Sequence, residues 1–314
     1  MSIEQPFREL EARLSPRRLE VDVALAPLST FRIGGPADRL FRARTPDELA
    51  NVVLAVRELD VPHFLLGKGA NILVADKGFR GLVIRNEVAG VDFLDGARVR
   101  VGAGVETYPD LIERTVARGL GGLHHFVGIP STVGGAMWQN LHFLSPAPAR
   151  ERTVFIEEFV EAADILSEEG DRHTVDREYF CFAYDYSVLH HRADVILSVD
   201  FALYEAPEDE LRRVMAENLE WRKERHPNLA VHASAGSIFQ KIEGVGAGRL
   251  IDECGLKGHV HGRAQIFEHH ANIIVNHGGA TAADVRALID IAQQRVAGET
   301  GYNLIPEITF VGEF

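Results

Sequence analysis

Short apolar segments that end in glycine-rich turns constrain this chain more than any other feature. One turn, Gly67-Lys68-Gly69-Ala70-Asn71, follows the apolar stretch 64–66, and another, Gly102-Ala103-Gly104, follows 98–101. A third glycine-rich segment covers 128–135. Glycine lets the backbone approach a ligand closely and present bare N–H groups to phosphate oxygens. Strands that end in such turns, with helical segments between them, predict mixed α and β layers.

The turns match neither of two common phosphate-binding fingerprints. The dinucleotide pattern needs a third glycine, but Ile72 and Thr107 occupy that position, and no G-x-x-x-x-G-K-[ST] sequence is present. One such turn alone would usually be structural. Three of them, together with the segment 32–35, favour a large phosphate-containing ligand.

Helices and strands alternate along the chain. Thr45, Pro46 and Glu48 form a helix start, with a capping threonine and a proline in the first turn. A second helix begins at Thr281 with Asp284 as a capping acid, and its apolar positions 285, 288, 289, 292 and 296 predict a buried face. Further helices are expected at about 109–117 and 206–226, and strands at 64–66, 82–84, 98–101, 160–166 and 195–204.

Composition narrows the class of protein. A chain of 314 residues with 46% hydrophobic and 25% charged residues predicts about two globular domains. The net charge of −13 argues against broad nucleic-acid binding. The two cysteines, Cys181 and Cys254, and a start without a signal-peptide pattern predict a cytoplasmic protein. No run of 18 apolar residues is present, so we expect no membrane insertion.

Several ordered sequence blocks carry a resemblance to a known family. They are Thr30-Phe31-Arg32-Ile33-Gly34-Gly35, Gly67-x-Gly69-Ala70-Asn71-Ile72-Leu73, Gly128-Ile129-Pro130-x-Thr132-Val133-Gly134-Gly135-Ala136, Ser234-Ala235-Gly236-Ser237-x-Phe239, the segment 248–258, His270-Ala271-Asn272 and Pro306-Glu307. Their succession resembles the UDP-N-acetylenolpyruvoylglucosamine reductase (MurB) family from about residue 29 to 311.

The resemblance implies an α+β fold with two parts. The first, residues 1–200, would be an FAD-binding domain of the vanillyl-alcohol-oxidase (PCMH) type, with two lobes split near residue 65. The second, residues 201–314, would be a smaller α+β substrate-binding domain. The implied reaction is the NADPH-dependent reduction of UDP-N-acetylglucosamine enolpyruvate through non-covalently bound FAD, which yields the peptidoglycan precursor UDP-N-acetylmuramate.

The same resemblance implies roles for individual residues. Ser237 would protonate the intermediate, and Glu307 would lie near its carboxylate end. The expected substrate residues are Tyr184, Arg222, Lys241, Arg249, Gln265 and Asn272. The expected cofactor residues are Thr30, Arg32, Gly34, Gly67, Gly69, Ala70, Asn71, Ile72, Gly128, Ile129, Pro130, Ser131, Thr132, Gly134, Gly135 and Ala136.

Structural interpretations of several of these residues remain open. Ser234 and Ser237 also fit a turn in which hydroxyls cap the backbone. Glu307, after a proline, fits a charge at a strand edge, and Arg222 and Lys241 fit a solvated charged face. Paired histidines such as His124-His125 and His190-His191 do not have the spacing of a metal site, so no metal is expected.

Two positions depart from the family pattern. Asp185 stands where the family has an arginine that helps hold the enolate, and Leu141-His142-Phe143-Leu144 replaces a small, glycine-rich stretch after Asn140. The missing cation could come from Arg192, His190, His191 or Arg249, or Asp185 could point to solvent. The alternatives are a non-catalytic flavin or nucleotide-sugar binding protein and a flavin oxidase of the same fold. The nucleotide-sugar and NADPH are the expected partners, and a monomer is expected.

Overall fold

The computed structural model describes residues 4–14 and 18–314, and its backbone divides into two compact units. Unit 1 comprises Met1–Leu19, Phe41–Lys68 and Ile84–Trp221. Unit 2 comprises Glu20–Leu40, Gly69–Val83 and Arg222–Phe314. Two short segments from the first third of the sequence therefore belong to the same unit as the last third.

The secondary structure alternates between helices and mostly short strands. The helices are α1 Glu4–Arg13, α2 Pro46–Glu58, α3 Ile112–Val116, α4 Val133–Gln139, α5 Glu208–Arg225, α6 Ala247–Glu253 and α7 Ala282–Thr300. The strands to residue 121 are β1 Glu20–Ala24, β2 Pro36–Ala43, β3 His63–Leu66, β4 Ile72–Val74, β5 Phe79–Asn86, β6 Val91–Phe93, β7 Arg98–Gly102 and β8 Leu120–Gly121. The later strands are β9 His142–Leu144, β10 Thr153–Phe155, β11 Val160–Leu166, β12 Arg172–Asp176, β13 Val195–Ala202, β14 Tyr204–Glu205, β15 Val260–His261, β16 Ala264–Ile266, β17 Ile274–Asn276 and β18 Thr309–Val311.

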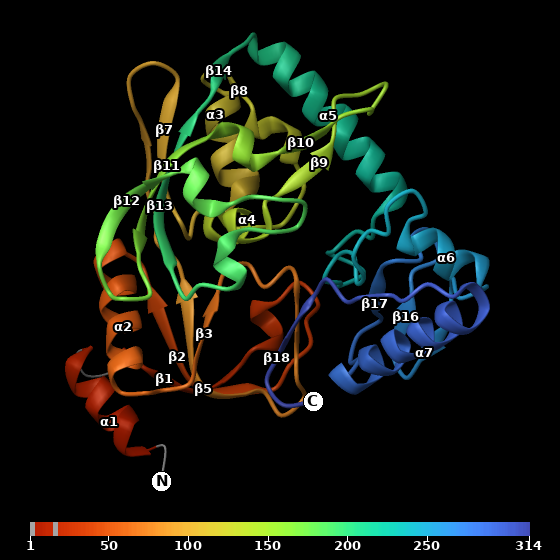
Figure 1. Ribbon diagram of the computed structural model, residues 1–314, viewed down its shortest axis with the longest axis horizontal. Coiled ribbons are helices and arrows are strands. Elements are labelled where there is room, and N and C mark those ends of the chain that lie inside the picture. Colours follow the sequence, from red (N-terminus) through yellow and green to blue (C-terminus); the bar gives the residue numbers. More distant parts are fainter. Residues whose placement is uncertain (1–3, 15–17) are drawn as a thin grey trace. The chain divides into compact units, whose positions relative to one another are not determined.

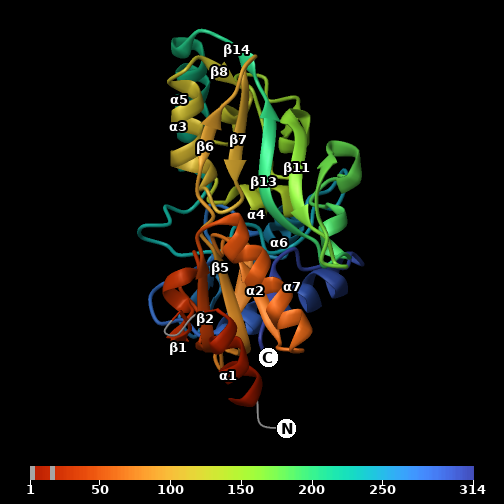
Figure 2. The same cartoon turned by 90° about the vertical axis from the view of Figure 1, so that its left-hand side faces the viewer.

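Unit 1 is built on a five-stranded antiparallel sheet with the order β12-β11-β13-β7-β6, of which β6, β7, β13 and β11 lie side by side in Figure 2. Alternation along β7 explains its two faces, because Val99 and Val101 are buried whereas Arg100 pairs with Asp200 at 2.6 Å on the outer side. Helices α2 and α4 both pack on the central strand β13. This core therefore supports the start of α4, where several expected cofactor residues lie.

Unit 2 contains an antiparallel sheet with the order β15-β16-β17, and α6 and α7 lie beside it (Figure 1). Its second strand pairing is parallel and joins β4 to β18, with Ile72 opposite Thr309. Strand β4 comes from the segment 69–83. Its pairing with β18 explains why this early segment belongs to the last unit, whose core includes Phe31, Leu73, Ile238 and Leu288.

A further sheet has the strand order β1-β2-β5-β3. The boundaries between the two units fall inside β2 and β5, at residues 40/41 and 83/84. Strand β1 pairs with β2 in antiparallel fashion, with Val21 opposite Arg39.

The two helix starts that the sequence predicts are confirmed. The Thr45 hydroxyl accepts the Glu48 N–H at 3.1 Å, and the Thr281 hydroxyl accepts the Asp284 N–H at 3.0 Å. The apolar positions predicted for the second helix are buried: Val285, Leu288, Ile289, Ala292 and Val296. Capping and 3.6-residue periodicity are local properties, which is why they could be predicted correctly.

The helix expected at 109–117 is shorter than predicted. An irregular helical turn over Thr107–Leu111 precedes α3, and Tyr108 has extended backbone angles, φ −133° and ψ 134°. The residue before a proline is driven towards such angles by the clash with the proline ring, which accounts for the irregular start. The strand expected at 195–204 is likewise divided, into β13 and β14.

The two units do not divide the chain at residue 200. The functional assignment of 1–200 to cofactor binding and 201–314 to substrate binding stays a prediction, because backbone compactness does not report what each part binds. Among residues 4–14 and 18–314, no helix combines the length and the apolar character needed to cross a bilayer.

Candidate active site

The turn after β3 packs against the start of α4 in unit 1. A Cβ atom on Gly67 would lie 2.7 Å from Thr132 Oγ1, so a larger residue would displace that hydroxyl. The Arg85 guanidinium donates to the Gly67 carbonyl, and burial lowers the pKa of Arg85. The Lys68 ammonium pairs with the Glu106 carboxylate. The backbone of this glycine turn is therefore held from several sides.

The first turn of α4 has its N–H groups satisfied within unit 1. The Val133 N–H donates to Val105 O at 2.9 Å, and the Gly134 N–H donates to Ala103 O at 2.8 Å. The Gly135 N–H donates to Thr132 Oγ1 at 3.3 Å. These amides are therefore not bare donors, which differs from the expectation for Gly134 and Gly135.

N–H groups without a protein acceptor lie immediately before the start of α4. Within the described ranges, the N–H groups of Ser131 and Thr132 donate to no other residue. Glu106 lies opposite Thr132 across a single β-bridge, and Gly128 has φ +76°. The segment from Gly128 to Thr132 thus retains unused donors although the helix start does not.

Unit 2 contains a second row of unused donors, in the turn before β4. In the part of the chain that the structure describes, the N–H groups of Gly69, Ala70 and Asn71 donate to no protein acceptor. Gly69 has φ +67°, and a Cβ on it would lie 2.5 Å from Leu28 O, so both its backbone angle and its surroundings require glycine. Successive N–H groups around a left-handed residue are suited to bind an anion.

The segment 30–35 lies beside this turn in unit 2. The Thr30 N–H donates to Gly69 O at 3.0 Å, and the Thr30 hydroxyl donates to Ser234 O at 2.7 Å. A Cβ on Gly34 would lie 2.6 Å from Val74 Cβ. Arg32 is exposed and donates to Leu229 O at 3.1 Å. Expected cofactor residues from two distant segments therefore lie together.

The backbone segments that contain Ser237 and Glu307 are neighbours in unit 2. The Glu307 N–H donates to Ile238 O at 2.8 Å, and Phe239 and Pro306 face each other across a β-bridge. Ser237 itself pairs with Ile273 on the other side. The side chain of Asn71 reaches Glu307 O at 3.5 Å, so the turn with the unused donors adjoins this pair.

The expected substrate residues have varied surroundings. The Asn272 amide accepts the Phe239 N–H at 3.0 Å and donates to Phe239 O at 2.8 Å, which makes it part of the backbone framework. The Gln265 amide donates to Gly258 O at 3.1 Å. Arg249 pairs with Glu253 at 2.7 Å and is 70% exposed. Their substrate contacts remain predictions.

Arg222, Lys241 and Tyr184 differ in exposure. Arg222 is half-buried, and burial lowers its pKa to about 10, which argues against the solvated-face interpretation. Lys241 is exposed. Tyr184 in unit 1 is 45% exposed and lies 4.5 Å from His142, measured between ring centroids.

Comparison with known proteins agrees with these features. The family model described as "UDP-N-acetylenolpyruvoylglucosamine reductase, C-terminal domain" matches residues 227–311, and the model described as "FAD binding domain" matches residues 37–176. The UDP-N-acetylenolpyruvoylglucosamine reductase of Moorella thermoacetica is 38% identical over 91% of this chain and 92% of its own length. That of Anaeromyxobacter sp. is 39% identical over 98% of this chain and 92% of its own length. The chain belongs to the UDP-N-acetylenolpyruvoylglucosamine reductase family.

A solved structure supports the same conclusion. The crystal structure of this reductase from Thermus caldophilus has a TM-score of 0.76 and 33% identity, and the match covers 93% of this chain and 99% of that chain. The predicted α+β fold with an FAD-binding domain is confirmed, and the protein is an FAD-dependent oxidoreductase.

The residues present fit FAD. FAD carries a diphosphate and a polar ring edge, and both need hydrogen-bond donors. The unused amides of Gly69–Asn71 in unit 2 and of Ser131 and Thr132 in unit 1 are such donors. Among the described residues, no group of three histidine, cysteine or acidic side chains is placed to hold a metal ion.

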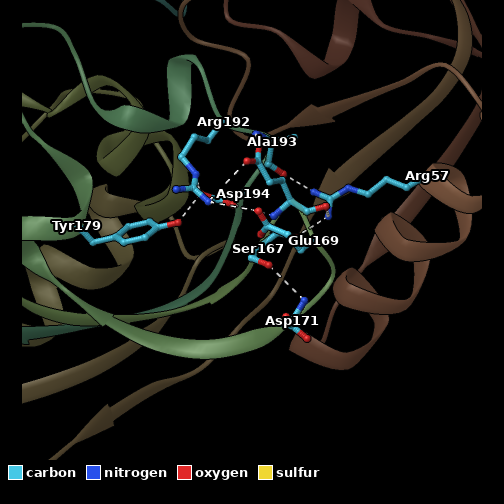
Figure 3. Close-up of polar contacts among 9 residues, drawn as sticks. Arg57, Ser167, Glu169, Asp171, Tyr179, Arg192, Ala193 and Asp194 are labelled. Atoms are coloured by element: carbon cyan, nitrogen blue, oxygen red, sulfur yellow. Dashed lines mark hydrogen bonds and ion pairs between the residues drawn. The ribbon is translucent and has the colours of Figure 1, made fainter.

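Arg192, one of the cations expected to replace the family arginine, pairs with an acidic residue in unit 1. Its role as the replacement stays a prediction. Figure 3 shows its guanidinium beside Asp194, with Nε 2.8 Å from Oδ2. The fully buried Asp194 carboxylate also accepts the Tyr179 hydroxyl at 2.6 Å, and burial together with this bond raises the pKa of Tyr179 to about 12. Arg57 from α2 donates to Ser167 O and Ala193 O in the same cluster.

The alternative that Asp185 points to solvent is wrong. Its side chain is only 12% exposed, and its Oδ1 lies 3.7 Å from His142 Nδ1. The sequence did not mark three residues as members of the candidate site. His142 contacts Asp185, and Arg85 and Glu106 contact the turn at Gly67 and Lys68. For His142 a signal was available, because it lies in the stretch after Asn140 that departs from the family pattern. Arg85 and Glu106 carry no local motif.

Proposed function

We propose that this protein reduces UDP-N-acetylglucosamine enolpyruvate to UDP-N-acetylmuramate, a peptidoglycan precursor, with NADPH as the electron donor. The relatives named as UDP-N-acetylenolpyruvoylglucosamine reductases support the substrate. The observation that carries the proposal is the bond from the Glu307 N–H to Ile238 O, because it joins the backbone at Glu307 to the residue that follows Ser237. The chemistry needs a proton donor and a group that stabilises negative charge, and a hydroxyl and a carboxyl group can fill these roles.

The reaction adds a hydride to one carbon of the enolpyruvyl double bond and a proton to the other. FAD, when bound, supplies the redox chemistry by which the hydride passes from NADPH to the substrate. After the hydride arrives, negative charge on the substrate carboxylate must be stabilised until the proton is delivered. The protein therefore has to provide a proton donor and a group that stabilises this charge.

Ser237 is the proposed proton donor. Within the described ranges its hydroxyl makes no hydrogen bond to another residue, whereas the Ser234 hydroxyl accepts the Gly236 N–H at 3.4 Å. Ala235 and Ile238 are buried, and Ser237 between them is half-buried. A serine hydroxyl is a weak acid, but a strongly basic carbanion needs only a donor in the right place.

Glu307 is proposed as the group that stabilises the negative charge on the substrate carboxylate. It is half-buried, and its backbone N–H bonds to Ile238 O, next to Ser237 in the chain. To favour an anionic intermediate it would act in its protonated form or through a water molecule. In unit 2, Arg222 and Lys241 would meet the diphosphate, Arg249 would add positive charge, and Gln265 and Asn272 would contact the sugar. Tyr184 in unit 1 is the remaining expected contact.

The test compares two serines of one turn. In Ser237→Ala, NADPH should bleach the bound flavin as in the wild type, and anaerobic reoxidation by UDP-N-acetylglucosamine enolpyruvate should slow by about 10²- to 10⁴-fold. Ser234→Ala, the matched control, should reoxidise at nearly the wild-type rate because its hydroxyl serves the backbone. Equal rates for Ser237→Ala and the wild type would remove Ser237 from the mechanism.

The reduced wild-type protein, mixed with substrate without air and then with oxygen, separates the alternatives. Substrate binding without reoxidation would favour a non-catalytic binding protein. Rapid reoxidation by oxygen with no response to the enolpyruvyl compound would favour a flavin oxidase. A cytoplasmic location and a monomeric state are part of the proposal, and size-exclusion chromatography with light scattering tests the second.

A further inference from the structure

One arginine side chain holds the first peptide of the turn after β3. Arg85 is half-buried on β5, and its guanidinium donates to the carbonyl of Gly67, the first residue after β3 ends at Leu66. Both residues belong to unit 1. A hydrogen bond from a charged donor is stronger than one between neutral groups, so this contact fixes the peptide between Gly67 and Lys68.

The bond to Gly67 O also sets the direction of the next N–H group. The peptide between Gly67 and Lys68 is trans, and in a trans peptide the C=O and the N–H point in opposite directions. The Lys68 N–H is therefore directed away from Arg85. Within the described ranges it donates to no protein acceptor, so it is an unused donor with a fixed orientation.

Further unused donors lie against this turn in unit 1. A Cβ atom on Gly67 would lie 2.7 Å from Thr132 Oγ1, and the N–H groups of Ser131 and Thr132 have no protein acceptor in the described part of the chain. The Lys68 ammonium pairs with Glu106, which faces Thr132 across a β-bridge. The two segments therefore contact each other, and their unused N–H groups suit an anionic group such as the diphosphate of FAD.

The charge of Arg85 is retained at a cost in free energy. Its neighbours on β5, Ile84 and Asn86, are buried, and burial lowers the pKa of Arg85. Withdrawing a cation from water is unfavourable, so packing of the strand alone would favour an apolar side chain at this position. The bond to Gly67 O gives the guanidinium a role that an apolar side chain could not fill.

We propose that Arg85 is a positioning residue for FAD, which acts through the Gly67 carbonyl to direct the Lys68 N–H toward an anionic group of the cofactor. Arg85 acts through this peptide and does not itself touch FAD. The inference goes beyond the reductase proposal, because it concerns how unit 1 holds the cofactor and requires no particular substrate.

Titration of the flavin-free protein with FAD, followed by flavin fluorescence, measures the effect on affinity. Arg85→Met keeps a long side chain but cannot donate, so the Kd for FAD should rise at least about tenfold. Arg85→Lys keeps a charged donor and should stay within about threefold of the wild type. Arg98 on β7 also donates to a backbone carbonyl, Asp95 O at 3.1 Å, so Arg98→Met is the matched control and should change the Kd less than about twofold.

Amide hydrogen exchange separates positioning from a general loss of stability. In the wild type, saturating FAD should slow exchange of the Lys68 N–H by at least about tenfold. In Arg85→Met at saturating FAD this protection should be largely lost. The Val133 N–H, which donates to Val105 O at 2.9 Å in the same unit, should keep its wild-type exchange rate in the variant.

Three results would overturn the inference. They are an Arg85→Met protein that binds FAD within about twofold of the wild type, a wild-type Lys68 N–H that FAD does not protect, and an equal loss of protection at Lys68 and Val133 in the variant. If Arg85→Met does not fold, the wild-type exchange measurement still decides. None of these readouts requires turnover, so a failure of the reductase proposal would leave the inference intact.

Discussion

The Thr30 hydroxyl links two segments that are far apart in the sequence. It donates to Ser234 O at 2.7 Å and so links the segment 30–35 to the turn that carries Ser237. The neighbouring serines in that turn have separate roles, one as a backbone acceptor and one without a partner in the described ranges. Residue type alone cannot distinguish such roles, because a hydroxyl forms whichever bonds the fold presents.

Replacing Thr30 with valine should therefore loosen the Ser237 turn. Valine keeps the shape but leaves the buried carbonyl without its donor, so we expect a loss of about 1 kcal/mol in the free energy of unfolding. Urea denaturation of the flavin-loaded protein measures it. An unchanged midpoint would show that this bond contributes nothing to the stability of the unit.

Gly67→Ala should weaken flavin binding. The added Cβ would lie 2.7 Å from Thr132 Oγ1, so the segment that retains the unused amides has to shift. We expect at least a tenfold higher Kd for FAD, measured by titration of the flavin-free protein. Gly298→Ala in α7 is the matched control: nothing lies within 4 Å of its added Cβ, so its FAD affinity should match the wild type.

At the scale of elements, α7 has a cap that comes from outside its own sequence. The Asp76 carboxylate accepts the Ala282 N–H at 2.7 Å and the Ala283 N–H at 3.1 Å, while Thr281 and Asp284 form the local capping box. The local box could be read from the sequence. Asp76 could not, because it lies about 200 residues away and meets α7 only in the folded unit.

Asp76→Ala should destabilise unit 2 although no motif marks the residue. Two helix N–H groups lose their acceptor, and the negative charge near the helix start disappears, which together cost about 1 to 2 kcal/mol. Chemical denaturation followed by helix circular dichroism measures the loss. Asp209→Ala, at an exposed position in the first turn of α5, serves as the control and should cost less.

The stability of unit 1 should fall in acid because of a buried histidine pair. Burial lowers the pKa of His124 to about 3 and that of His125 to about 4, and His124 Nδ1 accepts the Gly122 N–H, which requires the neutral ring. In the unfolded chain both titrate near 6.5. The unfolded state therefore binds more protons below that pH, so stability present above about pH 6.5 is lost as pH falls towards 4.

Melting temperatures measured between pH 7.5 and 4.5 check this pH dependence. His124→Asn keeps an acceptor for the Gly122 N–H but cannot be protonated, so its melting temperature should fall less steeply over this range than that of the wild type. Parallel curves for the two proteins would show that His124 does not contribute to the acid sensitivity.

At the scale of the whole molecule, bound FAD should stabilise the protein. The cofactor binds the folded chain and not the unfolded one, so flavin at about 100 times its Kd adds about 2.7 kcal/mol to the free energy of unfolding. Removal of the flavin should lower the melting temperature, and added FAD should restore it. A colourless protein that does not respond to FAD would contradict the assignment of the cofactor.

The sequence by itself determined the fold class, the family, the helix caps and the glycine turns. Each of these depends on neighbouring residues or on an ordered series of blocks, so each can be read along the chain. The tertiary structure decided which groups meet: Glu307 with the segment around Ser237, segments 20–40 and 69–83 with the last third of the chain, and His142 with Asp185. Such contacts join residues that are far apart in sequence, and only packing of the folded chain brings them within bonding distance.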